Sequence, residues 1–134
     1  MNSKHNVTIE FCKQQVLLSK CKDKKTAAIL VSADMTQIYS IGINGGPKGG
    51  EQCLCNATTQ MALEGNAQRP KYSCVHSEQN CLAKNTTIDQ IPKILICTFQ
   101  PCTVCASLIV NVQTNIQEVW FIDEYWDDRA VTMP

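Results

Sequence analysis

Hydrophobic and polar positions follow a helical period in some parts of this chain and form short, continuous apolar runs in others. Over residues 7–20, apolar side chains recur at helical spacing with polar residues between them. This period predicts a first amphipathic helix whose apolar side carries Val7, Phe11, Leu17 and Leu18.

Two apolar runs follow, at residues 26–32 and 37–43, and the polar stretch SADMT links them. They predict two strands that pair as a hairpin. The later pattern alternates helix and strand, with helices expected at residues 76–84 and 102–111 and strands at 93–98 and 117–122. Strand and helix alternation of this kind predicts an α/β fold in which helices cross over a sheet.

Residues 44–50 interrupt the pattern with four glycines and a proline, which predicts a loop. The stretch after it, residues 51–75, has no clear period, and one short helix is expected there, near residues 56–63. A long irregular stretch in a small domain usually carries a function or is cross-linked.

Composition narrows the class of protein. The 134 residues suit one domain, which we expect to cover residues 1–134. Lys plus Arg equals Asp plus Glu at 12 each, so no positive field favours a nucleic acid polymer or an anionic membrane. No apolar run could span a bilayer and no secretory segment opens the chain, so a cytoplasmic protein acting on a small molecule is expected.

The nine cysteines direct attention to metal chemistry, because thiols in a reducing compartment are more often metal ligands or buried packing groups than disulfides. His76 lies in the segment HSE, and Cys102 and Cys105 lie in the later segment PCTVC. A catalytic zinc takes three protein ligands and keeps one position for water, and these three residues supply that set. Both motifs are expected at the first turn of a helix, where the dipole favours thiolates.

Glu78 follows His76 by two residues, close enough to reach a zinc-activated water without being a ligand. His-x-Glu followed by Pro-Cys-x-x-Cys is the signature of zinc deaminases of nucleobases, with the Glu as general acid and base. Glu78 would take a proton from the water that attacks C4 of cytosine, then protonate N3 and afterwards the departing amine. The alternative is a redox pair or half of a zinc knuckle beside a chance His-x-Glu.

At these motifs the sequence resembles the cytidine and deoxycytidylate deaminases, most closely the deoxycytidylate (dCMP) deaminases, including those of phages. The resemblance spans residues 7–125 and rests on the segments KKTAAILVS, GINGGPKGG, VHSEQN, TFQPCTVCA and IQEVWFIDEY. It implies a three-layer α/β/α fold with a mixed central sheet, and conversion of dCMP to dUMP, which supplies dTMP synthesis. For a phage-encoded enzyme, the compartment would be the host cytoplasm.

Several positions depart from the family pattern. Ile43 replaces a usual Tyr, Gly46 a Ser or Phe, and Ser77 a usual Ala. The chain ends 13 residues after Phe121, whereas relatives continue with a helix and a fifth strand. We therefore expect a shortened C-terminus, with part of the pocket wall or oligomer interface missing or supplied by a neighbouring subunit.

The resemblance also implies roles for residues outside the zinc motifs. Asn44 would hydrogen-bond the sugar or base, Lys24 or Lys25 would hold the phosphate, and Tyr125 would pack near the nucleotide. The alternatives are a solvated lysine run and an ordinary rim aromatic. The resemblance further implies a homo-oligomer, commonly a hexamer, activated by dCTP and inhibited by dTTP near the Gly-rich loop.

Other cysteines suggest a second metal. Some phage dCMP deaminases carry a structural zinc, and Cys21, Cys53 and Cys74 resemble its ligands, with Cys55 as a further candidate. The alternative is four buried or free thiols. The remaining three cysteines fall at apolar positions and are expected to pack in the core: Cys12, Cys81 and Cys97.

Three functions other than dCMP deamination stay open on the sequence. One is deamination of free cytidine, deoxycytidine or dCTP. RNA editing is less favoured, because no net basic charge would track a backbone. The third is a catalytically silent, zinc-stapled interaction module, for which an uncoordinated Glu78 beside an open zinc position would have no use.

Overall fold

The computed structural model describes residues 3–21, 24–45, 75–87, 90–112 and 115–123. Within these residues, four strands form one mixed sheet, as predicted, and their order is β2-β1-β3-β4. They are β1 (Ala27–Ser32), β2 (Ile38–Ile43), β3 (Lys93–Phe99) and β4 (Ile116–Asp123).

Strand β1 lies inside the sheet, and its neighbour β3 gives the sheet its mixed character. Strand β1 pairs antiparallel with β2, through the predicted hairpin, and antiparallel with β3, while β3 and β4 run parallel. All six residues of β1 are buried, since helices cover both faces. A continuous apolar run such as AAILVS is what a strand buried on both faces requires.

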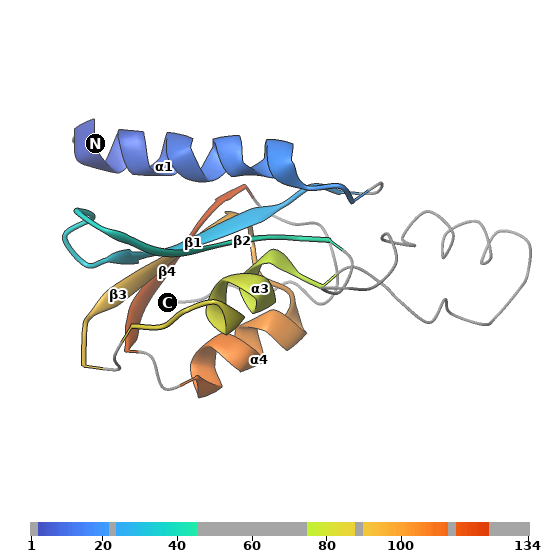
Figure 1. Cartoon of the computed structure of the whole chain (residues 1–134). Helices are drawn as coiled ribbons and strands as arrows, with labels where there is room; N and C mark the ends of the chain where they lie inside the picture. Colours follow the sequence, from blue (N-terminus) through green and yellow to red (C-terminus); the bar gives the residue numbers. More distant parts are fainter. Residues whose placement is uncertain (1–2, 22–23, 46–74, 88–89, 113–114, 124–134) are drawn as a thin grey trace, which may run out of the picture.

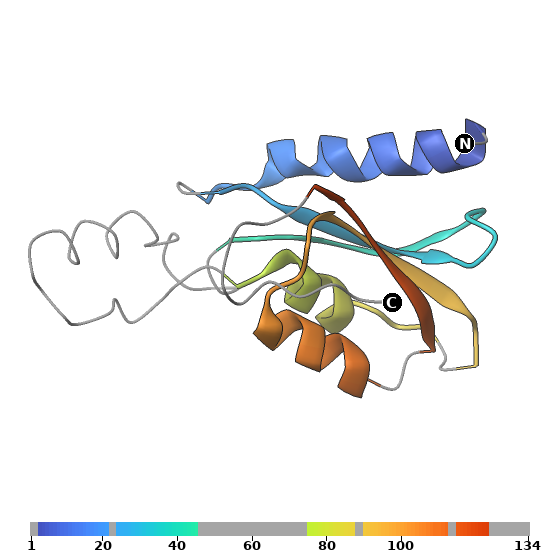
Figure 2. The same ribbon diagram turned by 180° about the vertical axis from the view of Figure 1, so that it is seen from behind.

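Helices cover the sheet on its two faces (Figures 1 and 2). Helix α1 (Ser3–Gln15) lies on one face, and α3 (Ser77–Ala83) and α4 (Thr103–Asn111) lie together on the other. Alternate residues of β1 serve the two cores: Ile29 and Val31 pack on the α1 side, Ala28 and Leu30 on the α3 side. The predicted three-layer α/β/α arrangement is thus confirmed.

The expected apolar side of the first helix is confirmed only at Phe11, which packs against the core on this face of the sheet, and is wrong at the other three positions. Val7, Leu17 and Leu18 are 69%, 73% and 61% exposed, whereas Thr8 and Cys12, one turn apart, are buried against the sheet. The α-helix also ends at Gln15, and a 3-10 turn, η1 (Val16–Leu18), completes the segment. Thr8 and Cys12 carry the contact together with Phe11. The Thr8 hydroxyl donates to the Lys4 carbonyl at 2.8 Å, which offsets the cost of burying it.

The other predicted elements agree with the structure to within one or two residues at their ends. Cys12, Cys81 and Cys97 are fully buried, as expected of packing residues. Three expected features lie outside the described residues: residues 46–50 of the loop expected over 44–50, the short helix near 56–63, and the shortened C-terminus after residue 123. No helix in the described part of the chain is long and apolar enough to cross a membrane.

Candidate active site

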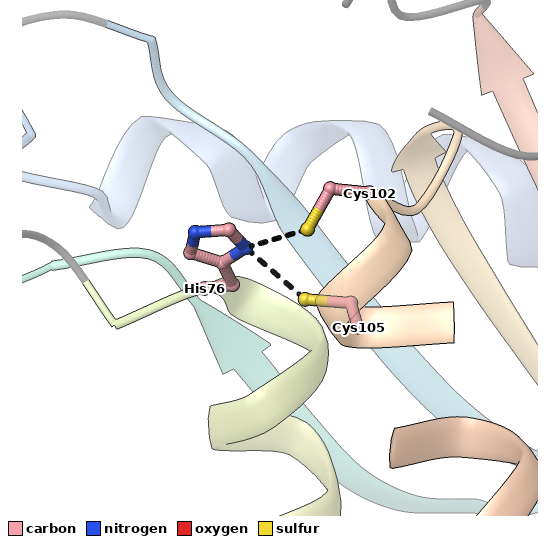
Figure 3. Close-up of side chains that lie close together, drawn as sticks. All are labelled: His76, Cys102 and Cys105. Atoms are coloured by element: carbon pink, nitrogen blue, oxygen red, sulfur yellow. Dashed lines mark hydrogen bonds between the residues drawn. The ribbon is translucent and has the colours of Figure 1, made fainter. Parts of the chain in front are cut away.

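Three side chains of the two zinc motifs meet between α3 and α4 (Figure 3). Nδ1 of His76 lies 3.1 Å from Sγ of Cys105 and 3.4 Å from Sγ of Cys102. The three candidate ligand atoms lie within 4.8 Å of one another. The structure thus brings together residues that lie up to 29 positions apart in the sequence.

This cluster has the dimensions of a zinc site. Zinc bonds of about 2.3 Å to sulfur and about 2.0 Å to nitrogen, at a tetrahedral angle, place a nitrogen and a sulfur ligand about 3.5 Å apart. The two nitrogen–sulfur distances of 3.1 and 3.4 Å are close to that separation. One imidazole and two thiols supply three ligands, so a fourth position would stay open for water.

Helix starts position the three residues, as predicted. His76 immediately precedes α3 in an extended conformation, and its backbone N–H donates to Oε1 of Gln79 at 2.9 Å. Cys102 holds the same place before α4, and Cys105 lies in the first turn of that helix. Burial nevertheless raises the pKa of the Cys105 thiol well above its usual range. The helix start alone therefore does not produce a thiolate there, and a bound cation would have to favour it.

Glu78, in the first turn of α3, is buried with 7% of its surface exposed. Burial raises the pKa of its carboxyl group above the ordinary value. Hydrogen bonds with its own backbone and with the thiols of Cys105 and Cys97, together with the charge of His76, act in the opposite direction. A carboxyl group whose raised pKa helps it to take up and release a proton suits a general acid and base.

Cys97 is the neighbour of Glu78 that sequence reasoning missed. Its position in the apolar run of β3 identified it as a packing residue, and its complete burial agrees with that. Its thiol also lies beside the Glu78 carboxyl group and acts to lower the pKa of that group. The apolar pattern around Cys97 gave no signal of this contact, because it depends on where α3 crosses the sheet.

Asn44, predicted to bind substrate, is buried and tied to the protein itself. Its Oδ1 accepts hydrogen bonds from the Thr26 backbone N–H at 2.9 Å and the Ser19 hydroxyl at 2.7 Å. Its Nδ2 donates to the Lys24 carbonyl. These contacts occupy both lone pairs of the side-chain oxygen, so at most one amide N–H is left for a substrate.

The two candidate phosphate lysines differ in their surroundings. Nζ of Lys24 lies 3.9 Å above the ring centroid of Phe99, the last residue of β3, which leads to the turn before Cys102. Lys25 is exposed. A cation–π contact holds an ammonium in place without neutralising its charge. Lys24 is therefore the better placed of the two at this end of the sheet.

Of the cysteines expected to hold a second zinc, Cys21 is described and buried. Cys53, Cys55 and Cys74 lie outside the described residues, as does Tyr125, so the second zinc stays a prediction. We expect metal analysis of the purified protein to give two zinc ions per chain, and one in Cys53→Ala, because a structural site that loses a thiolate ligand loses its metal. A single zinc in the parent protein would end this hypothesis.

Comparison with known proteins decides the family. A family model described as the cytidine and deoxycytidylate deaminase zinc-binding region matches residues 2–122. The chain belongs to this family. The predicted fold, zinc cofactor and hydrolytic deaminase chemistry are thereby confirmed.

This deaminase is also similar to solved structures. One is dCMP deaminase from the cyanophage S-TIM5 in complex with dCMP and dUMP, with a TM-score of 0.71 and 27% sequence identity, covering 93% of this chain and 85% of that one. Another is the apo form of the cyanophage enzyme, with a TM-score of 0.68 and 25% identity, covering 94% and 88%. No curated protein sequence matches this chain.

Proposed function

We propose that the protein is a zinc-dependent dCMP deaminase, which hydrolyses dCMP to dUMP and ammonia. The observation that carries this proposal is the convergence of the His76, Cys102 and Cys105 ligand atoms within 4.8 Å. The choice of dCMP is supported by the similarity to the S-TIM5 enzyme, which was solved with dCMP and dUMP, over 93% of this chain.

The residues of the site divide the reaction between them. His76, Cys102 and Cys105 would hold the zinc ion, which when bound acts as a Lewis acid and lowers the pKa of a coordinated water. Glu78 would accept the two protons of the attacking water one after the other, delivering the first to N3 and the second to the amino group at C4. One water is consumed and one ammonia leaves, so the carboxyl group ends the cycle in the state in which it began.

Lys24 would select the monophosphate. Lys24→Ala is expected to lower kcat/KM for dCMP by about tenfold to a hundredfold, mainly through KM, because a charged hydrogen bond to phosphate contributes about 1.5–3 kcal/mol. Deoxycytidine, which has no phosphate, should lose little. Steady-state kinetics on both substrates measure the difference.

Lys25→Ala is the matched control, since it removes the same charge from the exposed neighbouring position. It should leave both substrates nearly unchanged. Equal losses in the two variants would show a general electrostatic effect in place of a phosphate contact. If the parent enzyme prefers deoxycytidine, cytidine or dCTP, that compound would replace dCMP as the proposed substrate.

Finer features rest on the family resemblance and complete the proposal. They are one catalytic domain over residues 1–134, a homo-oligomer, commonly a hexamer, activation by dCTP, inhibition by dTTP, and action in the cytoplasm. Asn44 would contact the nucleotide through its remaining amide N–H, and Tyr125 would pack beside it.

A further inference from the structure

A hydroxyl pair connects the first turn of α3 with the segment before β1. Ser77 stands between His76 and Glu78 in the sequence and is fully buried. Its hydroxyl accepts a hydrogen bond from Oγ1 of Thr26 at 3.0 Å. The two residues are 51 positions apart. This bond therefore fixes the start of α3, which carries His76 and Glu78, against the start of β1.

Thr26 extends the connection to Lys24. Its backbone N–H donates to Oδ1 of Asn44 at 2.9 Å, and Nδ2 of Asn44 donates to the Lys24 carbonyl. Consecutive hydrogen bonds thus lead from Ser77 to the residue that we place at the phosphate. Thr26 and Asn44 are joined twice, because the Asn44 backbone N–H also donates to the Thr26 carbonyl at 3.3 Å.

Other polar contacts hold α3 farther along its length. Nδ2 of Asn80 donates to the Ile43 carbonyl at 2.7 Å, and the Ser40 hydroxyl donates to the Cys81 carbonyl at 2.7 Å. They act from the fourth residue of the helix onward and on its packing over β2. Among the described side-chain hydrogen bonds between α3 and the segment from Thr26 to Ile43, the Thr26–Ser77 bond alone acts on the residue between His76 and Glu78.

We propose that Ser77 is a positioning residue, which together with Thr26 sets the orientation of His76 and Glu78 relative to Lys24. The bond would hold the zinc ligands and the phosphate-binding lysine at the spacing that one bound nucleotide requires. This inference rests on the proposed function for its kinetic consequences. Its consequence for the metal does not, because the orientation of His76 affects zinc affinity whatever the substrate is.

The test uses Thr26→Val, Ser77→Ala and the double variant, with Thr26→Ser as the conservative change that keeps the hydroxyl. Zinc affinity, measured by chelator competition, should weaken about threefold to tenfold in each single variant, the size of one lost hydrogen bond. The double variant should bind zinc no more weakly than either single variant, because each single variant already loses the same hydrogen bond. Thr26→Ser should match the parent.

Kinetics supply a second measurement. Ser77→Ala should lower kcat and raise KM for dCMP, each about threefold to tenfold, but lower only kcat for deoxycytidine, which has no phosphate to misalign. Alanine, usual at this place in the resembling family, should fit the space. Thr36→Val, which removes a hydroxyl from the turn at the other end of the hairpin, is the control and should change neither quantity.

Unchanged zinc affinity in both single variants, or losses that multiply in the double variant, would overturn the proposal. So would a lower melting temperature with parental affinity and kinetics, which would indicate a structural role alone. Should Thr26→Val not fold, Ser77→Ala decides by the same criteria. A parent that binds zinc but does not deaminate dCMP would overturn the proposed function, and the affinity measurements would still decide the role of Ser77.

Discussion

Glu78→Gln is expected to lower kcat on dCMP by about a hundredfold to ten-thousandfold, the usual contribution of a general acid and base. Glutamine keeps the shape of the side chain but cannot accept and return a proton. Because Glu78 is proposed as a proton carrier and not as a ligand, the zinc content should equal that of the parent. Single-turnover kinetics and metal analysis on the same preparation measure both quantities.

The same substitution should not lower stability. Since burial raises the pKa of Glu78, the fold disfavours its ionised form, and the cost is present at pH values above the raised pKa. A neutral amide avoids that cost, so the melting temperature of the metal-free variant at neutral pH should equal or exceed that of the parent. A loss of activity that accompanied unfolding would not support the proposed role.

Glu118→Gln is the matched control, because it makes the same change at an exposed position of β4. It should deaminate dCMP as the parent does. If Glu78→Gln retained full activity with normal zinc content, the mechanism would be wrong. A parent protein that bound zinc but deaminated none of dCMP, dCTP, cytidine and deoxycytidine would instead point to the silent interaction module.

The zinc motifs and the sheet could be predicted from the sequence because both leave local signals. His76 and Glu78 belong to one short motif and Cys102 and Cys105 to another, and each motif marks a helix start. The continuous apolar run of β1 likewise predicts a strand that is buried on both faces. Such signals depend only on residues that are close together in the sequence, so the sequence alone contains them.

The side of α1 that faces the sheet could not be predicted in this way. A helical period shows that a segment is amphipathic only when the buried positions are apolar, and here the buried positions include Thr8. Val7, Leu17 and Leu18 suggested the opposite side of the helix. Phe11 alone of the four expected residues faces the sheet, where it packs with Thr8 and Cys12. That fit is a tertiary effect, which local hydrophobicity does not contain.

Polar contacts between distant segments were also beyond the sequence. Asn44 was predicted to bind substrate, yet most of its hydrogen-bonding capacity holds Ser19, Thr26 and Lys24 in place. The Thr26–Ser77 bond joins residues 51 positions apart. Each of these side chains would look ordinary on a surface, and they acquire a role only when the hairpin and α3 meet.

Gly42 is where that meeting is closest. It lies in β2 beneath α3, and a methyl group at its Cα would lie 2.8 Å from Cα of Cys81 and closer still to the Ser77 carbonyl oxygen and the Cys81 backbone N. These are backbone atoms of the helix, which cannot rotate away as a side chain would. Any residue larger than glycine must therefore push α3 off the sheet.

Gly42→Ala is accordingly expected to destabilise the protein by about 3 kcal/mol or more, at the upper end of the cost of overpacking a core. Zinc affinity should fall with stability, because α3 carries His76 away from Cys102 and Cys105. Thermal unfolding with and without zinc, together with chelator competition, measures both. Gly45→Ala is the control: a methyl group there meets nothing within 4 Å. Equal behaviour of the two variants would show that α3 can shift without disturbing the ligands, and that the contact at Gly42 does not position the site.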